Sequence, residues 1–224
     1  MVEKCDHGRF ITFEGGEGAG KSTQAAALVQ RLKAIKVAAR LTREPGGSSF
    51  AERVRQFILD PAIPPHQPLC EALMFSAARA DHLATLIRPS LENGHWVVCD
   101  RFADSTRAYQ GAAGGLSADT LSILENIVVA ETIPDLTVIL DLPVELAFAR
   151  VVARGRASAE GATAPTDPYE SRDGDFHERL RQGFLKIAAA APERCVVIDA
   201  SADQEVISRA VWHAVKKRLL QEDC

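Results

Sequence analysis

Five short segments of mostly apolar residues constrain the fold of this chain more than any other feature. They read "RFITFE" (9–14), "KVAARLTRE" (36–44), "HWVVCD" (95–100), "LTVILD" (136–141) and "RCVVID" (194–199). Continuous apolar runs, as opposed to alternating ones, are typical of strands that helices cover on both faces of a parallel sheet. The sequence therefore predicts an α/β fold with a five-stranded parallel sheet and helices on both faces.

The stretches between these segments have helical patterns. Apolar residues recur at helical spacing over residues 21–35. The remaining helices are predicted at residues 48–60, 69–92, 117–130, 143–154, 174–190 and 203–219. A chain of 224 residues is long enough for one domain of this class. We therefore predict a single domain over residues 1–224.

One segment interrupts the alternation of strands and helices. Residues 154–175 read "RGRASAEGATAPTDPYESRDGD" and are rich in Ala, Gly, Ser, Thr and Pro. A polar stretch of this length inside a compact domain is usually a mobile lid or is disordered. We predict a lid at roughly residues 154–175.

Charge and cysteine usage exclude several classes of partner. The formal net charge of −4 gives no electrostatic reason to expect a nucleic acid. The sequence contains no run of about 18 apolar residues, so no membrane span is predicted. The N-terminus does not resemble a signal peptide. The five cysteines are scattered without a C-x-x-C pair, which argues against a disulfide framework and a zinc site. We expect a cytoplasmic protein that binds neither nucleic acid nor membrane.

A glycine-rich loop follows the first predicted strand. The stretch "FITFEGGEGAGKST" (10–23) contains G-x-x-x-x-G-K-[ST], and it leads directly into a predicted helix. In such a loop backbone N–H groups surround phosphates, the lysine reaches the β- and γ-phosphates, and the hydroxyl ligates Mg²⁺. We predict that a nucleoside triphosphate binds the residues of this loop: Gly15, Gly16, Glu17, Gly18, Ala19, Gly20, Lys21, Ser22 and Thr23.

The rest of the chain indicates where the terminal phosphate goes. Switch GTPases recognise guanine through N-K-x-D, which is absent here, and motor ATPases are usually longer chains. The sequence instead places several arginines at predicted strand ends, on a helix face or in the lid: Arg43, Arg79, Arg101, Arg154 and Arg156. Arginines around a phosphate loop indicate two anionic substrates, a donor and an acceptor. The alternative is that each arginine forms a solvated surface ion pair.

Asp100 ends the third predicted strand. Ligands of open parallel sheets bind beyond the carboxyl ends of the strands, so this carboxylate shares an edge with the glycine loop. An acid at this place can hold Mg²⁺ directly or through water. The alternative is a turn or helix-capping aspartate. We predict that Ser22 and Asp100 form the magnesium site.

Four separated motifs stand out along the chain: "GGEGAGKST", "TREPGG" (42–47), "LMFSAARADHL" (73–83) and "DRFADSTRAYQGAAGGL" (100–116). Together, and in this order, they resemble the motifs of the thymidylate kinase family. The resemblance implies transfer of phosphate from ATP to dTMP, giving dTDP. It also implies a five-stranded parallel sheet with helices on both sides and, commonly, a homodimer.

The resemblance implies roles for residues of the acceptor site. Arg43 and Arg101 would grip the dTMP phosphate, Phe75 would stack on the thymine ring, and Arg79 would hydrogen-bond its O4. Phe75 and Arg79 are four residues apart, so they share one face of the predicted helix. The alternative for Phe75 is packing in the core.

Four positions of the motif at 100–116 complete the predicted acceptor site. By resemblance, Ser105 and Thr106 lie near the base, where a hydroxyl could meet N3 or a bridging water. Tyr109 would crowd the 2′ position of the sugar and so reject ribonucleotides. Gln110 would line the same pocket, with a solvated loop amide as its alternative.

The resemblance also bears on Glu17 and the lid. An acid among phosphates is expected to meet the sugar 3′-OH, Arg101 or the metal. Because the loop itself lacks arginine, the chain resembles the bacterial subtype whose lid supplies it, with Arg154 and Arg156 as candidates. Arg150 would flank the adenine. In "DPYES", Asp167, Tyr169 and Glu170 match an acidic and aromatic group of the family lid, and Pro168 departs from a position that is often basic.

These roles predict an ATP:dTMP phosphotransferase. Catalysis would come from alignment and charge neutralisation by Lys21, Arg101, Glu17, Arg154 and Mg²⁺, without a covalent intermediate. Two alternatives are a kinase for another nucleoside monophosphate and a nucleotide-binding module without catalytic activity.

Overall fold

Five parallel strands form one sheet in the part of the chain that the structure describes. The structure is a computed structural model; it describes residues 7–158, 169 and 172–220, with only the backbone for 154–158. The strands are β1 (Phe10–Glu14), β2 (Ala39–Arg43), β3 (Trp96–Asp100), β4 (Leu136–Asp141) and β5 (Cys195–Asp199). Their order across the sheet is β2-β3-β1-β4-β5, with every neighbouring pair parallel. The predicted fold class is therefore confirmed.

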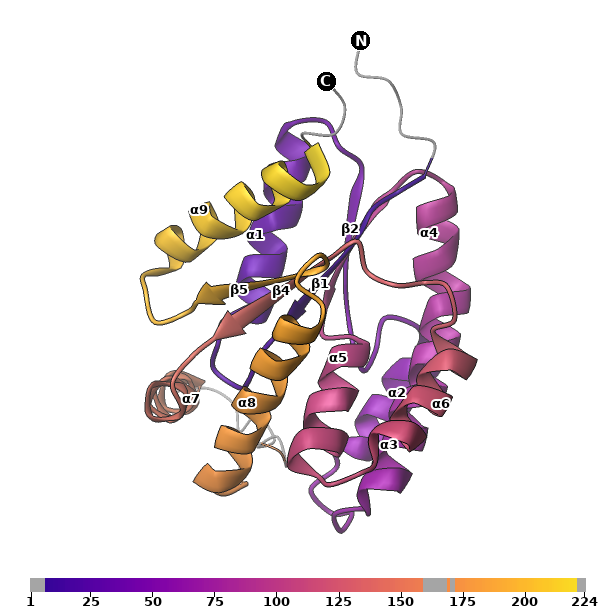
Figure 1. The fold of residues 1–224 in the computed structure, drawn as a ribbon, viewed down its shortest axis with the longest axis vertical. Coiled ribbons are helices and arrows are strands. Elements are labelled where there is room, and N and C mark those ends of the chain that lie inside the picture. The colour runs from indigo at the N-terminus through magenta and orange to yellow at the C-terminus, as the bar shows by residue number, and fades with distance from the viewer. Residues whose placement is uncertain (1–6, 159–168, 170–171, 221–224) are drawn as a thin grey trace.

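Helices fill the connections between the strands (Figure 1). The α-helices are α1 (Lys21–Ala34), α2 (Ser49–Ile58), α3 (Pro68–His82), α4 (Arg88–Glu92), α5 (Ala103–Thr106), α6 (Ala118–Val128), α7 (Val144–Ser158), α8 (Gly174–Ala190) and α9 (Gln204–Val215). Wider π-helical turns form η1 (Leu83–Ile87), η2 (Arg107–Ala113) and η3 (Lys216–Leu220). Since α3, η1 and α4 follow one another without a break, they make up the long helix that the sequence predicts at 69–92.

Two helical segments differ from the prediction. No helix was predicted over residues 103–113, where α5 and η2 lie, because this stretch contains weak helix formers such as Ser105, Thr106 and Gly111. The segment η2 packs against α8, and this burial outweighs intrinsic propensity. The backbone of α7 also continues to Ser158, so residues 154–158, the predicted start of the lid, are helical.

Helices cover the sheet on both faces, as Figure 1 shows for α1 and α9 on one side and for α8 and α5 on the other. Successive residues of β1 point to opposite faces. Ile11 and Phe13 join a core cluster with residues of α1 and α9, such as Leu28 and Val211. Phe10 lies in the cluster of the other face, together with residues of η1 and α4. Burial on both faces explains why the inner strands β1, β3 and β4 are almost continuously apolar, whereas the edge strands β2 and β5 have exposed residues.

The parallel register brings three strand ends to one edge of the sheet. Arg43 of β2 and Phe13 of β1 each pair with Asp100 of β3. The glycine loop leaves β1 at this level, and Glu44 and Arg101 follow directly after β2 and β3. The motifs that the sequence singles out therefore meet at the carboxyl edge of the sheet.

Two further expectations concern cysteines and membrane spans. Cys99 and Cys195 are buried strand residues, as their apolar surroundings predict, and Cys70 is exposed on α3. Within residues 7–158, 169 and 172–220, no helix has the length and hydrophobicity that crossing a membrane requires.

Candidate functional site

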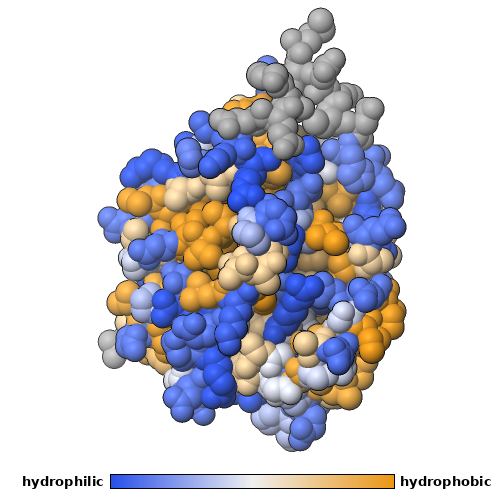
Figure 2. All heavy atoms as spheres, in the orientation of Figure 1, coloured by the Kyte–Doolittle hydropathy of each residue, from blue (hydrophilic) through white to orange (hydrophobic). Residues whose placement is uncertain are grey.

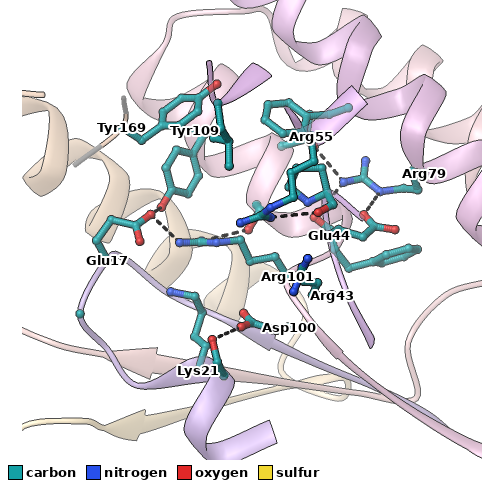
Figure 3. Close-up of a pocket in the computed structure, with 18 of the residues that line it drawn as sticks. Glu17, Lys21, Arg43, Glu44, Arg55, Arg79, Asp100, Arg101, Tyr109 and Tyr169 are labelled. Carbon is teal, nitrogen blue, oxygen red and sulfur yellow. Dashed lines mark hydrogen bonds and ion pairs between the residues drawn. The ribbon is translucent and has the colours of Figure 1, made fainter. Parts of the chain in front are cut away.

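A cavity of about 670 Å³ lies at the carboxyl edge of the sheet. Its walls come from the glycine loop, the ends of β2 and β3, helices α2, α3 and α7, and the segment α5–η2. Figure 3 shows Glu17 and Lys21 on one side of this cavity and Glu44 and Arg79 on the opposite side, with Arg101 between them. One cavity thus joins the phosphate loop to the helix that carries the predicted base contacts.

The glycine loop needs glycine where its backbone turns. Gly15 has a φ of +133°, and a Cβ there would lie 2.4 Å from the carbonyl oxygen of Leu140. Gly20 has a φ of +88° at the N-terminus of α1. Both conformations favour glycine over residues with a side chain. The loop directs the start of α1, with its free N–H groups, toward the cavity.

Lys21 is the first residue of α1 and lies in the wall of the cavity. Its Nζ donates a hydrogen bond of 2.6 Å to the carbonyl oxygen of Gly16. Burial and the neighbouring charge of Arg101 lower the pKa of Lys21 to about 8, although Glu17 and Asp100 act in the opposite direction. An anion in the cavity would favour the charged form of this amine.

Ser22 and Asp100 meet at the floor of the cavity, where the hydroxyl donates a hydrogen bond to Asp100 Oδ2. A hydroxyl and a carboxylate oxygen are ligands that Mg²⁺ prefers, and this ion is usually held by one or two protein groups together with phosphates and water. The donor set therefore fits Mg²⁺. Among the described residues, no group of three or more His, Cys, Asp or Glu side chains could hold a metal without such help.

Glu17 connects the glycine loop to Arg101 and Tyr109. Its Oε1 accepts hydrogen bonds of 2.5 Å from Arg101 Nη2 and of 2.5 Å from the Tyr109 hydroxyl. Burial alone would raise the pKa of Glu17, but the charges of Arg101 and Lys21 outweigh burial and lower it to about 2. Of the three partners that the sequence left open for this acid, the structure shows Arg101.

Arg101 is held in a backbone conformation that only a well-determined site tolerates. Its φ is 70°, in the left-handed region, which is costly for a residue with a side chain. Its Nη1 donates to the carbonyl oxygen of Gly15 at 3.0 Å and to Ser105 Oγ at 3.3 Å. The guanidinium also lies 5.0 Å from the centre of the Tyr109 ring. The side chain is thereby fixed between the loop and the segment α5–η2.

A buried acid, Glu14, interacts electrostatically with Arg101. Glu14, at the end of β1, accepts hydrogen bonds from the backbone N–H of Phe102 at 2.8 Å and from the hydroxyl of Ser105 at 2.6 Å. Burial, together with the negative charge of Asp104, raises the pKa of Glu14 to about 8. Burial therefore favours the neutral form of this acid, which accepts hydrogen bonds from the turn after β3.

Arg79 of α3 is buried in the far wall of the cavity. Its Nε donates to Glu44 Oε2 at 2.7 Å, and its Nη2 donates to the Phe102 carbonyl oxygen and to Thr106 Oγ1, each at 3.1 Å. Glu44 is fixed in turn by His82, whose Nδ1 lies 3.0 Å from Glu44 Oε1. The guanidinium is therefore held by three partners, Glu44, Phe102 and Thr106, that lie far from Arg79 in the sequence.

Aromatic side chains line the same wall. Phe75 lies one helical turn before Arg79 on α3, and its ring centre is 6.4 Å from that of Tyr169. The rings of Tyr109 and Tyr169 meet edge to face at 5.4 Å. Phe75 is partly buried against the neighbouring core cluster and still lines the cavity. Phe75 therefore both packs against the core and lines the cavity.

Two arginines lie at the outer rim. Arg43 is half exposed, and its Nη2 is 3.0 Å from Glu52 Oε2 of α2. Arg150 of α7 lines the cavity and donates a hydrogen bond of 3.4 Å to the Ser201 carbonyl oxygen. Both side chains have part of their guanidinium in solvent, unlike Arg79.

The structure brings most of the predicted site residues to the main cavity. Those that line it are Glu17, Gly18, Gly20, Lys21, Ser22, Thr23, Arg43, Phe75, Arg79, Asp100, Arg101, Ser105, Thr106, Tyr109, Gln110, Arg150 and Tyr169. Gly15 and Gly16 line a small separate hollow beneath the loop, and the Ala19 side chain is buried in the core. The side chains of Arg154 and Arg156, and residues Asp167, Pro168 and Glu170, lie outside the described residues.

Several residues of the site had no predicted role. Glu44 and Arg55 line the cavity, and Glu14 and Glu71 lie buried behind it. Glu44 follows Arg43 within "TREPGG", and Glu71 precedes Phe75 by one helical turn. Their positions beside predicted contacts are the signal that could have found them. The sequence signal for Glu14 is weaker than those for Glu44 and Glu71, because it consists only of a single acid at the end of an apolar strand.

Comparison with known proteins gives one consistent result. Residues 13–211 match the family described as thymidylate kinase. A thymidylate kinase of Nitrobacter hamburgensis is 50% identical over 216 residues, which cover 96% of this chain and 91% of that protein. One of Rhodopseudomonas palustris is 51% identical over 223 residues, covering 98% and 94%. The crystal structure of thymidylate kinase from Ehrlichia chaffeensis matches with a TM-score of 0.73 and 32% identity, covering 93% of this chain and 99% of that one. The chain therefore belongs to the thymidylate kinase family.

Proposed function

We propose that this protein transfers the γ-phosphoryl group of ATP to dTMP, giving dTDP and ADP. Membership of the thymidylate kinase family supports this reaction. The observation that carries it at the level of the site is the single cavity, which contains a triphosphate-binding loop at one end and a ring beside a guanidinium at the other. Two anionic nucleotides can therefore meet head to head over one edge of the sheet.

On the donor side, the glycine loop and Lys21 would hold the triphosphate of ATP. The backbone N–H groups at the start of α1 and the Lys21 ammonium both attract phosphate oxygens. Arg150, at the rim between α7 and the turn after β5, would flank the adenine. Its partial exposure supports this role, since a planar guanidinium can stack on a flat ring.

On the acceptor side, we assign base stacking to Phe75 and contact with the O4 atom to Arg79. Arg43 and Arg101 would grip the dTMP phosphate. Ser105 and Thr106 are hydrogen-bonded to Arg101 and Arg79, so we assign them to the support of these arginines beside the base. Tyr109, which is fixed by Glu17, would close the space at the 2′ position of the sugar.

The reaction needs alignment more than chemistry from the protein. An oxygen of the dTMP phosphate forms a bond to the γ-phosphorus while the bond from that phosphorus to the bridging oxygen of ADP breaks. Lys21 and Arg101 would neutralise the charge that both phosphates bring together. Glu17 would hold Arg101 in place, and Arg154 would add a further positive charge from the lid.

Mg²⁺ fits the pair of oxygen ligands that Ser22 and Asp100 offer. When bound there, the ion would neutralise negative charge of the triphosphate and so reduce its repulsion of the acceptor. We therefore propose Ser22 and Asp100 as its protein ligands.

We further propose that the protein acts as one domain and that residues from roughly 154 to 175 form a lid. A closed lid would exclude water from the cavity and so suppress hydrolysis of ATP. The position of Tyr169, a described residue of this segment packed on Tyr109, supports a closing role at the acceptor side. The three free thiols among the described residues favour a cytoplasmic location.

A homodimer is supported by exposed apolar side chains on two neighbouring helices. Leu69 and Leu73 of α3 and Ile123 and Ile127 of α6 are each at least 45% exposed. The helices contact one another, and Figure 2 shows hydrophobic surface at the edge where α6 lies. Patches of this kind mark protein interfaces. We therefore propose that two copies associate through α3 and α6, and light scattering of Ile127→Asp should report a monomer.

The test of the activity is a coupled assay of ADP release with ATP and one acceptor at a time. The acceptors are dTMP, dUMP, UMP, CMP, GMP and AMP. We expect ADP release to depend on the acceptor and kcat/KM to be highest for dTMP. A higher value for a purine nucleotide or CMP would point to another monophosphate kinase. ADP release independent of any acceptor would reject the transfer reaction.

A further inference from the structure

We infer that Glu71, a buried acid with no role in the activity proposed above, is a positioning residue that decides which pyrimidine the site accepts. It would do so by fixing the side-chain amide of Gln110 with its carbonyl oxygen toward the cavity. This inference rests on the proposed function, because it names the feature that separates a 4-oxo pyrimidine nucleotide from a 4-amino one.

Glu71 lies on the same side of α3 as the predicted base contacts. Glu71, Phe75 and Arg79 are spaced four residues apart on this helix, so they follow one another along one face. Gln110 approaches this face from η2, one helical turn after Thr106, whose hydroxyl accepts the hydrogen bond from Arg79. Along this face of α3, Phe75 therefore lies between Glu71, which contacts Gln110, and Arg79, which contacts Thr106.

The contact between Glu71 and Gln110 fixes the orientation of the amide. Gln110 Nε2 donates a hydrogen bond of 2.9 Å to Glu71 Oε2, and both side chains are more than nine-tenths buried. The other oxygen of Glu71 lies 3.7 Å from Arg172 Nη2. A carboxylate only accepts hydrogen bonds, so the NH₂ group of Gln110 must face Glu71. The amide oxygen must then point the opposite way.

That opposite side is the cavity. Gln110 is one of its lining residues, and within the described part of the chain its Oε1 receives no hydrogen bond. A hydrogen-bond acceptor is thus left available to a ligand in the cavity. Arg79 lines the same cavity and supplies a donor, and this cannot change because a guanidinium carries donors only.

A donor next to an acceptor is complementary to only one kind of pyrimidine edge. Thymine and uracil present an N3–H donor beside an O4 acceptor, whereas cytosine presents an N3 acceptor beside an N4 amino donor. Cytosine would place acceptor against acceptor at Gln110 and donor against donor at Arg79. Sites with buried polar groups reject a ligand that leaves them unpaired. Glu71 contributes to this selection through the orientation of Gln110.

The roles of the two buried acids of this wall differ. Glu44 determines only where the Arg79 guanidinium lies, because rotation of that group leaves donors facing the base in every orientation. Glu71 determines whether Gln110 presents its amide oxygen or its NH₂ group to the base, since an amide turned by 180° exchanges an acceptor for a donor. A change at position 71 should therefore alter specificity, and not merely weaken binding.

The decisive variant is Glu71→Gln. The amide that replaces the carboxylate can donate or accept, so Gln110 is free to turn either way. We expect kcat/KM for dTMP to fall about 10- to 100-fold while that for dCMP stays the same or rises, so that their ratio falls. The ratio of dTMP to dUMP should stay within about twofold, because both bases share the same N3 and O4 edge.

A rescue variant keeps the test decisive even where Glu71→Gln folds poorly. In Glu71→Gln/Gln110→Glu the two groups exchange places, and a carboxylate oxygen again faces the base as an acceptor. We expect this double variant to regain most of the discrimination between dTMP and dCMP. The matched control is Glu178→Gln, because Glu178 accepts a hydrogen bond of 2.8 Å from Gln182 at an exposed position of α8. This control should leave all acceptors unchanged.

The possible outcomes separate the inference from the activity on which it depends. If the unaltered protein prefers dTMP over dCMP and Glu71→Gln keeps the same ratio, the role of Glu71 is wrong and the activity stands. Equal losses for dTMP and dCMP, with no recovery in the double variant, would likewise reduce Glu71 to a structural acid. If the unaltered protein does not phosphorylate dTMP, the proposed function itself fails.

Discussion

The inner wall and the outer rim of the cavity hold their arginines in opposite ways. At the inner wall, Arg79 is only 5% exposed and is fixed by Glu44, a backbone carbonyl and Thr106. At the rim, the side chain of Arg43 is 54% exposed and pairs with Glu52, whose side chain is 39% exposed. The arginine of the inner wall is therefore preorganised, whereas the arginine of the outer rim is adjustable.

This difference fits the proposed roles of the two arginines. A base is recognised by the direction of a few hydrogen bonds, so the groups that contact it benefit from rigid support. A phosphate that changes its charge and its bonding during transfer can be met by one adjustable charge, which Arg43 would supply, beside the fixed guanidinium of Arg101. The buried carboxylates behind the inner wall are the physical basis of its rigidity.

The largest expected effect tests the support of the inner wall. Arg79→Ala should leave Glu44 buried without its charged partner and lower the free energy of unfolding by about 3–5 kcal/mol. Arg43→Ala removes only an exposed pair and should cost at most about 1 kcal/mol. Urea denaturation of both variants measures the difference. Equal losses would show that the two arginines are held alike.

Lys21→Ala tests the phosphate end. If the Lys21 ammonium contacts the phosphates as proposed, its loss should lower kcat about 10²- to 10³-fold, as removal of one preorganised charge typically does. The fold should persist, because α1 keeps its packing on the sheet. Lys33→Ala, at an exposed position of the same helix, is the control. Activity close to that of the unaltered protein would exclude the glycine loop as the site of transfer.

Phe75→Ala compares the two ends of the cavity through the binding of dTMP and of ATP. Loss of a stacking surface should weaken dTMP binding by about 1–3 kcal/mol. Affinity for ATP should stay the same, since the ring lies at the far wall. Titration calorimetry with each nucleotide measures both values, with Phe57→Ala on the exposed side of α2 as the control. An unchanged dTMP affinity would return Phe75 to a role in core packing.

Glu14→Gln concerns the layer behind the cavity and should change only how stability depends on pH. Because the pKa of Glu14 is about 8 in the folded protein and about 4.5 when unfolded, the unfolded state binds fewer protons between these values. Stability that is fully present below pH 4.5 is therefore lost as pH rises toward 8, by up to about 1.4 kcal/mol per pH unit.

The amide in Glu14→Gln cannot ionise, so this contribution to the pH dependence should disappear. Thermal unfolding of the variant and of the unaltered protein at pH 6 and at pH 8 measures the change. We expect the variant to lose less stability between the two conditions. If both proteins show the same dependence, Glu14 is ionised in the folded state at neutral pH.

The sequence by itself determined the scaffold and the chemical type of the site. Apolar runs identify buried parallel strands because burial on both faces removes polar alternation, and all five predicted strands are present. The glycine loop was equally readable, since its φ values restrict positions such as Gly15 and Gly20 to glycine. These features are local, so neighbouring residues suffice to define them.

Only the tertiary structure decided how the side chains are paired. Glu17 and Arg101 are 84 positions apart, and Glu71 and Gln110 are 39 apart, so no local pattern connects them. The segment α5–η2 became helical through burial against α8, against its own weak propensity. Which carboxylate fixes which donor depends on how helices pack over the sheet, because a buried charge is stabilised only by the partner that the fold brings to it.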